Sequence, residues 1–179
     1  MNGSPGVRDG TPADAAACAA VYAPYVTDTV VSFELEPPGA AEFAARMADA
    51  AARHAWLVLT DPAGGDRVVG YAYGHEFAAR AAYRFSCEVS VYLEVGRRRS
   101  GGGRLLYEAL LQRLAARGYR RVFAGIVLPN AASEGLHRAL GFGPVGVYRR
   151  VGWKHGAWHD VAWVQRSLGD EVDPPAEPR

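Results

Sequence analysis

The sequence predicts a single α/β domain in which helices cover the faces of a mixed β-sheet. Along its 179 residues, stretches with helical periodicity alternate with stretches of two-residue, strand-like periodicity. Hydrophobic residues make up 49% of the chain and charged residues 22%, as is typical of a folded globular protein. We expect the domain to span residues 1–168 and the acidic, proline-rich residues 169–179 to form a disordered tail.

Charge and cysteine content narrow the classes of partner and location. The formal net charge is +1, so the overall charge indicates neither a nucleic-acid partner nor an anionic membrane. Cys18 and Cys87 lie far apart and fit no metal-binding or disulfide pattern. No stretch has the apolar length of a signal peptide or a membrane span. We therefore expect a cytoplasmic protein without a metal.

The N-terminal half contains a clear signal for the start of a helix and, further on, a segment in which a helix is ruled out. Thr11 is expected to cap a helix, with Asp14 three residues later as the second member of a capping box. The β-branched residues 25–35 are expected to be extended or looped, and two prolines follow them, which forbids a helix there. The other elements expected in this half are strands at residues 7–8, 56–60 and 68–74 and an alanine-rich helix at residues 40–53.

Residues 85–93 (FSCEVSVYL) predict a strand with one apolar and one polar face. Their side chains alternate, so that Phe85, Cys87, Val89, Val91 and Leu93 share the apolar face. The polar face carries Ser86, Glu88, Ser90 and Tyr92.

The strand is followed by GRRRSGGG (residues 96–103) and then by an amphipathic helix that is expected to end at Gly118. A glycine costs a helix roughly 1 kcal/mol relative to alanine, so three of them make an unusual helix start. Backbone N–H groups of a glycine-rich loop at a helix N-terminus bind pyrophosphate, although a ligand-free turn remains the alternative. No lysine follows for a nucleoside-triphosphatase loop, and Leu106 stands where a dinucleotide-binding fingerprint needs its third glycine.

The C-terminal half alternates strands with one short helix. Residues 121–127 predict a buried strand, and Asn130 is expected to cap a helix that ends before Gly141. Strands are expected near residues 145–151 and 158–165.

At this point the sequence resembles a known family. Arg98, Gly101 and Gly103 fit the R/Q-x-x-G-x-G/A signature of the GNAT superfamily of N-acetyltransferases. A narrower resemblance to the phosphinothricin acetyltransferases runs from about residue 7 to residue 168. Its motifs are RAAY at residues 80–83, ExxVYL at 88–93, LPNxAS at 128–133, LHxALGF at 136–142 and WKHGAWHDVAW at 153–163. The resemblance implies the GNAT fold, a central mixed sheet flanked by helices.

The resemblance also implies acetyl-CoA as co-substrate and no metal. The loop residues expected to hold its pyrophosphate are Arg98, Arg99, Ser100, Gly101, Gly102, Gly103 and Arg104. Main-chain groups of Val91, Tyr92 and Leu93 are expected to pair with the pantetheine arm and the acetyl oxygen. Asn130 is expected to bind the coenzyme as well as to cap its helix. Relatives commonly carry a bulky aliphatic residue in place of Gly102, so we expect a looser loop here.

Two residues are implied as catalytic. Glu88 matches ExxVYL, and the resemblance makes it the general base that deprotonates the acceptor ammonium. By its neighbours alone, a glutamate between Ser86 and Ser90 is more simply a solvated strand residue. His137 matches LHxALGF and can act as a base or as an acid toward the coenzyme A thiolate; the sequence leaves the direction of proton transfer open. Tyr107 is placed either near the sulfur or in the core.

The acceptor pocket is implied by the RAAY motif. The expected substrate-binding residues are Arg80, Tyr83, Phe33, Tyr107 and Val161. A guanidinium pairs well with a carboxylate or phosphinate, which suits a small anionic amino acid. Relatives often have a second cation two residues before this arginine, and Ala78 at that position weakens the expected anion pocket.

These inferences together predict an N-acetyltransferase for phosphinothricin or a similar amino acid, which would confer resistance to it. The resemblance further implies a homodimer. Methionine sulfone, methionine sulfoximine or another small amine is the alternative acceptor. A non-catalytic coenzyme A-binding module is the alternative from a different class, although binding alone would require neither Glu88 nor His137.

Overall fold

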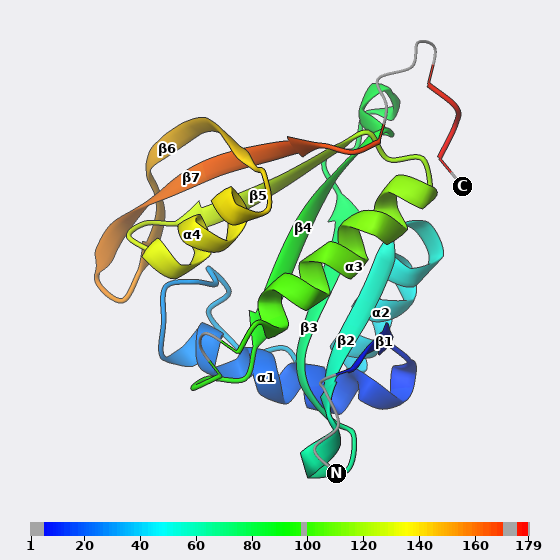
Figure 1. Cartoon of the computed structure of the whole chain (residues 1–179). Helices are drawn as coiled ribbons and strands as arrows, with labels where there is room; N and C mark the ends of the chain where they lie inside the picture. The colour runs from blue at the N-terminus through cyan, green and yellow to red at the C-terminus, as the bar shows by residue number, and fades with distance from the viewer. Residues whose placement is uncertain (1–5, 98–99, 170–174, 179) are drawn as a thin grey trace.

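The computed structural model describes residues 6–97, 100–169 and 175–178, and these form a seven-stranded sheet with helices on both faces (Figure 1). The strands are β1 Gly6–Asp9, β2 Ala55–Asp61, β3 Arg67–Glu76, β4 Ser86–Leu93, β5 Arg121–Val127, β6 Gly143–Lys154 and β7 Ala157–Ser167. The α-helices are α1 Ala15–Thr27, α2 Ala40–Arg53, α3 Gly102–Ala116 and α4 Ala131–Ala139. The strand order is β1-β2-β3-β4-β5-β7-β6, and the sheet is mixed because β4 and β5 are parallel, whereas the other neighbours are antiparallel.

The helices pack on the sheet through two hydrophobic clusters, one on each face. α3 covers one face, where its buried leucines lie in one cluster with Ala72 and Val89. Tyr71 points to the opposite face, because side chains alternate along a strand, and it is buried with residues of α1 and α2. Glu88 precedes Val89 on β4, so its side chain lies on the α1/α2 side of the sheet.

The parallel pair β4–β5 is short, and this opens the sheet. Only Ser86, Cys87 and Glu88 of β4 are in register with β5, at Arg121–Phe123, whereas β4 pairs with β3 as far as Leu93. Beyond Glu88 the two strands diverge, as Figure 1 shows. The rest of β4 therefore keeps a free backbone edge on its β5 side.

Most predicted elements are confirmed. For two of them, the helix at residues 40–53 and the strand at 121–127, the predicted first and last residues are also those observed. The expectation of an extended chain at residues 25–35 is wrong for its first three residues, because α1 continues through Thr27. Val26 is buried in the core, so tertiary packing outweighs the low helix propensity of this segment and the presence of Pro24. Within the described residues no helix has the length and hydrophobicity needed to cross a membrane.

The tail remains only partly described. Residues 170–174 and 179 lie outside the described residues, so its expected disorder stays a prediction. In the described part, Glu177 accepts hydrogen bonds from the Arg84 guanidinium at 2.7 Å.

Candidate active site

The opening between β4 and β5 forms a cavity of about 400 Å³. β4, β5, α3, α4 and the α1–α2 loop contribute its walls. The lining residues are Val31, Val89, Ser90, Val91, Tyr92, Tyr107, Ala124, Gly125, Ile126, Val127, Asn130, Ser133 and His137. The fold thus gathers predicted coenzyme-binding residues of β4 and α4 with His137 and Tyr107 in one cleft.

Hydrogen bonding fixes which backbone groups of β4 face this cleft. The Glu94 amide donates to the Val69 carbonyl of β3 at 2.8 Å. Because the direction of the backbone amides and carbonyls alternates along a strand, those of Tyr92 and Ser90 also face β3. The amide and carbonyl of Val91 therefore face the cleft, as those of Leu93 do, whereas those of Tyr92 face β3. The Leu93 carbonyl already accepts a hydrogen bond from the Tyr25 hydroxyl at 2.7 Å. Of the three residues predicted to hold the pantetheine, Val91 offers the most accessible edge.

The glycine loop ends beside the cleft. Gly101 is the residue before α3 and has a φ of 77°, a left-handed conformation that glycine adopts without strain. A Cβ on Gly103 would lie 3.4 Å from Leu136 of α4 and 3.7 Å from Leu93 of β4, so this glycine lets the helix N-terminus approach both elements. The amides of the first turn have no acceptor inside the helix, and its positive end favours an anion.

The side chains of the loop are partly engaged within the protein. Ser100 donates its hydroxyl to the Arg97 carbonyl at 3.2 Å. Arg104 forms an exposed ion pair with Glu108 at 2.7 Å, so it is available to a phosphate only by leaving that partner. Arg98 and Arg99 lie outside the described residues. The described residues contain no group of histidine, cysteine or acidic side chains arranged to hold a metal ion.

Tyr107 and His137 form a buried hydrogen-bonded pair on the α3 side of the cleft. The Nδ1 atom of His137 lies 2.8 Å from the carbonyl oxygen of Ser133, which can only accept, so Nδ1 carries the hydrogen. In the neutral ring Nε2 is then an acceptor, and the Tyr107 hydroxyl, 3.1 Å away, donates to it. The same hydroxyl lies 3.4 Å from the Val89 carbonyl at the open edge of β4.

Burial sets the protonation of this pair. Desolvation lowers the pKa of His137, which keeps the ring neutral near pH 7, and the hydrogen bond to Ser133 only partly offsets it. Burial also raises the pKa of Tyr107 well above its usual value, so the phenol stays protonated. The pair therefore presents a neutral phenol whose orientation is fixed by a neutral imidazole.

Glu88 lies on the other face of β4, at the last residue of the parallel pairing. Its side chain is 25% exposed. Burial raises the pKa of the carboxyl, while the nearby His75 opposes the rise. A carboxyl with a raised pKa is a stronger base than an exposed one and suits proton abstraction near neutral pH. The structure thus separates the two predicted catalytic residues by the thickness of one strand, at the point where the sheet opens.

A family model described as "Acetyltransferase (GNAT) domain" matches residues 7–163. The chain belongs to the GNAT acetyltransferase family. The phosphinothricin N-acetyltransferase of Streptomyces viridochromogenes is 38% identical over 97% of this chain and 91% of its own. The L-methionine sulfoximine/L-methionine sulfone acetyltransferase of Pseudomonas paraeruginosa is 35% identical over 92% of this chain and 95% of its own.

The solved structures agree with this assignment. A GNAT superfamily phosphinothricin acetyltransferase from Sinorhizobium meliloti, determined in complex with AcCoA, superposes with a TM-score of 0.89. It is 35% identical in sequence, and the match covers 99% of this chain and 100% of that one. The predicted GNAT fold is therefore confirmed.

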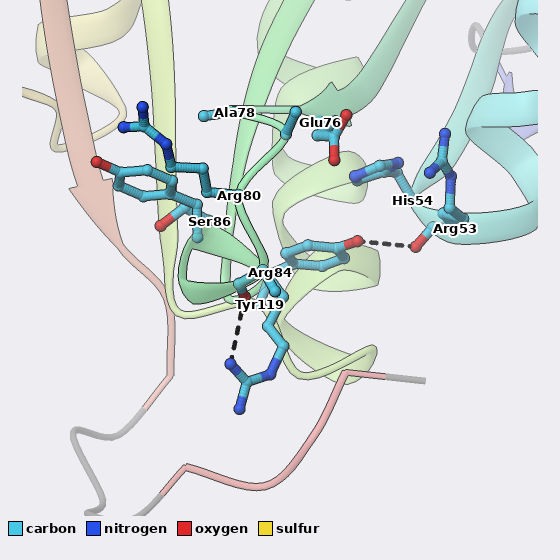
Figure 2. A pocket seen from close by; sticks show the side chains of 11 residues that line it. Arg53, His54, Glu76, Ala78, Arg80, Arg84, Ser86 and Tyr119 are labelled. Atoms are coloured by element: carbon cyan, nitrogen blue, oxygen red, sulfur yellow. Dashed lines mark hydrogen bonds between the residues drawn. The ribbon is translucent and has the colours of Figure 1, made fainter.

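The GNAT domain has a second pocket, of about 500 Å³, at the opposite end of β4, and this is where Arg80 and Tyr83 lie (Figure 2). His54, Glu76 and Tyr119 also line it. In Figure 2 the Arg80 side chain points away from His54 and Tyr119. The structure therefore places the two residues of the RAAY motif in a pocket separate from the cleft that holds Tyr107.

Phe33 and Val161 lie close to the GNAT cleft along β6 and β7. Phe33 covers Gly152 of β6 so closely that a Cβ there would lie 2.3 Å from its ring. The Phe33 ring also lies 6.3 Å, between centroids, from that of His159. Val161 is buried on β7, and a Cβ on the cleft residue Gly125 would meet it at 3.4 Å. The substrate-binding role expected of these two residues stays a prediction.

Three residues at this GNAT site were not singled out from the sequence: Ser133, His75 and Lys154. Ser133 fixes the tautomer of His137 through its backbone, which no side-chain pattern reveals. His75 is the cross-strand partner of Glu88. Lys154 is 4% exposed and holds the α1–α2 loop by donating to the carbonyls of Val26 and Ser32, both at 2.6 Å. The roles of His75 and Lys154 could not be predicted from local sequence patterns, because strand register and loop packing are tertiary properties.

Proposed function

We propose that this protein transfers the acetyl group of acetyl-CoA to the amino group of phosphinothricin or a similar small amino acid. The observation that carries the proposal is the opening of the sheet after Glu88, which places a half-buried carboxyl on one side of a free strand edge and the Tyr107–His137 pair on the other. A thioester lying along that edge meets an amine from one face and a hydrogen-bond donor from the other. The names of the full-length relatives support this reaction.

In the proposed reaction the main chain holds the coenzyme. The amides of residues 100–104 bind the pyrophosphate, and Val91 and Asn130 pair with the arm that leads to the thioester. Glu88 removes one proton from the acceptor ammonium. The amine nitrogen then attacks the thioester carbon, so that a C–N bond forms and the C–S bond breaks. One of the two hydrogens left on the nitrogen passes as a proton to the departing thiolate, which leaves as the free thiol of coenzyme A.

Tyr107 stabilises the leaving sulfur in this scheme. Because burial raises its pKa, the phenol donates a hydrogen bond to the thiolate and does not give up its proton. His137 is a positioning residue: in the free protein its neutral ring accepts the single hydrogen of the Tyr107 hydroxyl and so orients that group. In the proposed scheme this hydrogen turns from Nε2 to the sulfur as the thiolate forms.

The substitution Glu88→Gln tests the reaction against simple coenzyme binding. We expect turnover to fall about 100-fold or more, within the range of general-base effects, while the acetyl-CoA Kd stays within twofold of the wild type. Calorimetry measures the Kd, and release of free thiol measures turnover. A wild-type protein that binds acetyl-CoA but acetylates no amine would instead be a coenzyme A-binding module.

Methionine sulfoximine is the second candidate acceptor. Relatives named for it match this chain at 34–35% identity. A comparison of kcat/KM for phosphinothricin and methionine sulfoximine decides between them. A higher value for the sulfoximine would reassign the substrate.

We also propose that two copies associate through the outer face of β6 and β7. Exposed apolar side chains gather on this hairpin: Val145, Val147, Tyr148, Val151, Trp153 and Trp158. Several exposed apolar side chains on one hairpin favour an interface there, and a two-fold pair is the commonest arrangement. A monomer mass in sedimentation at micromolar concentration would refute the dimer. We place the enzyme in the cytoplasm, where acetylation of a toxic amino acid would confer resistance.

A further inference from the structure

His75 faces Glu88 from the neighbouring strand. The two residues are directly paired in the β3–β4 register, and the His75 Nε2 atom lies 3.9 Å from the Glu88 Oε1 atom. The His75 side chain is 39% exposed and that of Glu88 is 25% exposed, so the imidazole is the more solvent-accessible of the two groups.

A backbone contact fixes the tautomer of His75. Its Nδ1 atom lies 3.1 Å from the carbonyl oxygen of Glu76, which can only accept a hydrogen bond. Nδ1 therefore carries the hydrogen in the neutral ring, and Nε2, the atom nearer to Glu88, holds the lone pair. The ring is oriented to take a proton from the side of the carboxyl.

We infer that His75 receives the proton that Glu88 takes from the acceptor ammonium and passes it to solvent. This inference rests on the proposed function of Glu88 as the base. In the first step an N–H bond of the ammonium breaks and an O–H bond forms on Glu88. In the second step that O–H bond breaks and an N–H bond forms at Nε2 of His75. The imidazolium then gives a proton to water or buffer, which restores both groups for the next turnover.

Among the described residues, the other groups that the structure brings to the charge or the register position of Glu88 do not offer this route. Tyr73 of β3 and Tyr107 of α3 are the phenols that interact with its charge, and burial raises the pKa of both, so neither is a proton acceptor. On the β5 side the residue in register is Phe123, which has no titratable group. Once protonated, His75 carries the charge that opposes the rise in the pKa of Glu88.

Chemical rescue tests the relay. In His75→Ala, assayed at low buffer concentration with acetyl-CoA and the best acceptor from the substrate comparison, we expect kcat to fall about tenfold with an unchanged KM for acetyl-CoA. Added imidazole should restore kcat in proportion to its concentration, because it can occupy the vacated position and carry the proton. The wild type and Glu88→Gln are the controls, and imidazole should accelerate neither.

The outcomes separate the relay from the proposed base. If Glu88→Gln keeps full turnover, Glu88 is not the base and the proposed mechanism fails. If Glu88→Gln is inactive while His75→Ala turns over like the wild type, only the relay is overturned. A His75→Ala enzyme that is slow but insensitive to imidazole gives His75 a structural role and also overturns the relay.

Discussion

Lys154 offers the sharpest test of how the acceptor side is built. Its ammonium is buried and lies 2.6 Å from two carbonyl oxygens, those of Val26 near the end of α1 and Ser32 in the following loop. Burial lowers the pKa of Lys154, and the carboxylate of Glu34 offsets part of that effect. The loop that it holds carries Phe33. Lys154→Met keeps most of the apolar stem of the side chain and removes the three donors.

The structure allows the size of the effect to be estimated. Each buried carbonyl that loses its donor costs about 1–3 kcal/mol, so two give about 2–6 kcal/mol. Relief of the desolvation of the ammonium and entry of water into the loop reduce this sum, and we expect a loss of about 3 kcal/mol. For a domain of this size that corresponds to a fall in Tm of roughly 6–12 °C.

Urea unfolding measures the loss of stability, and steady-state kinetics measures its effect on the site. We expect the acceptor KM to rise about tenfold because Phe33 is no longer held against β6, while the acetyl-CoA Kd stays within twofold. Lys154→Arg, which keeps the charge and several donors, is the matched control and should lose less. A Lys154→Met protein as stable as the wild type, with unchanged acceptor KM, would show that the two hydrogen bonds do not hold the loop.

Three further substitutions test separate parts of the molecule. Tyr107→Phe removes the hydroxyl that we propose faces the sulfur and should lower kcat by about 10- to 100-fold without changing acetyl-CoA affinity, and an unchanged kcat would remove Tyr107 from the mechanism. Gly152→Ala places a Cβ 2.3 Å from the ring of Phe33 and should raise the acceptor KM, so an unaltered KM would mean that this ring does not border the acceptor. The pKa of Asp14 is lowered from 3.8 to about 2, chiefly by its hydrogen bonds with Arg8, and its side chain is 10% exposed. A depressed folded-state pKa contributes stability above pH 4 that is lost as the pH falls through about 2, roughly 2 kcal/mol in all. Asp14→Asn should therefore be less stable at pH 7 by about that amount in urea unfolding, and an equal stability at pH 7 would contradict the estimate.

Much of the fold was predictable because local patterns and tertiary structure agree. The capping box of Thr11 and Asp14 forms at the predicted place, with the Thr11 amide donating to the carboxylate at 2.8 Å. Asn130 caps α4 by accepting from the Ser133 amide at 3.1 Å. The end of α1 was not predictable from propensity, since burial of Val26 decides it.

The candidate residues of the site could be named from motifs, but their arrangement could not. Motifs identified Glu88 and His137, yet their placement on opposite faces of β4 follows from alternation along the strand combined with the packing of α4, which the sequence does not specify. Arg80 was assigned to the same pocket as Tyr107 by resemblance, and the structure puts it at the other end of the strand. The contact between Lys154 and Ser32 joins residues 122 positions apart, beyond the reach of any local pattern.

The short parallel pairing explains why these residues sit where they do. Pairing that continued to Leu93 would satisfy the edge of β4 with β5 and leave no main-chain groups for a ligand. Pairing that ended before Glu88 would expose the carboxyl and remove the burial that raises its pKa. The divergence of β4 and β5 directly after Glu88 leaves main-chain groups of β4 free for a ligand and also keeps the carboxyl partly buried. It gives the two substrates of the proposed reaction separate faces of the sheet. Substitutions near Phe33 should therefore alter acceptor kinetics, and substitutions near Gly103 should alter coenzyme affinity, with little overlap between the two effects.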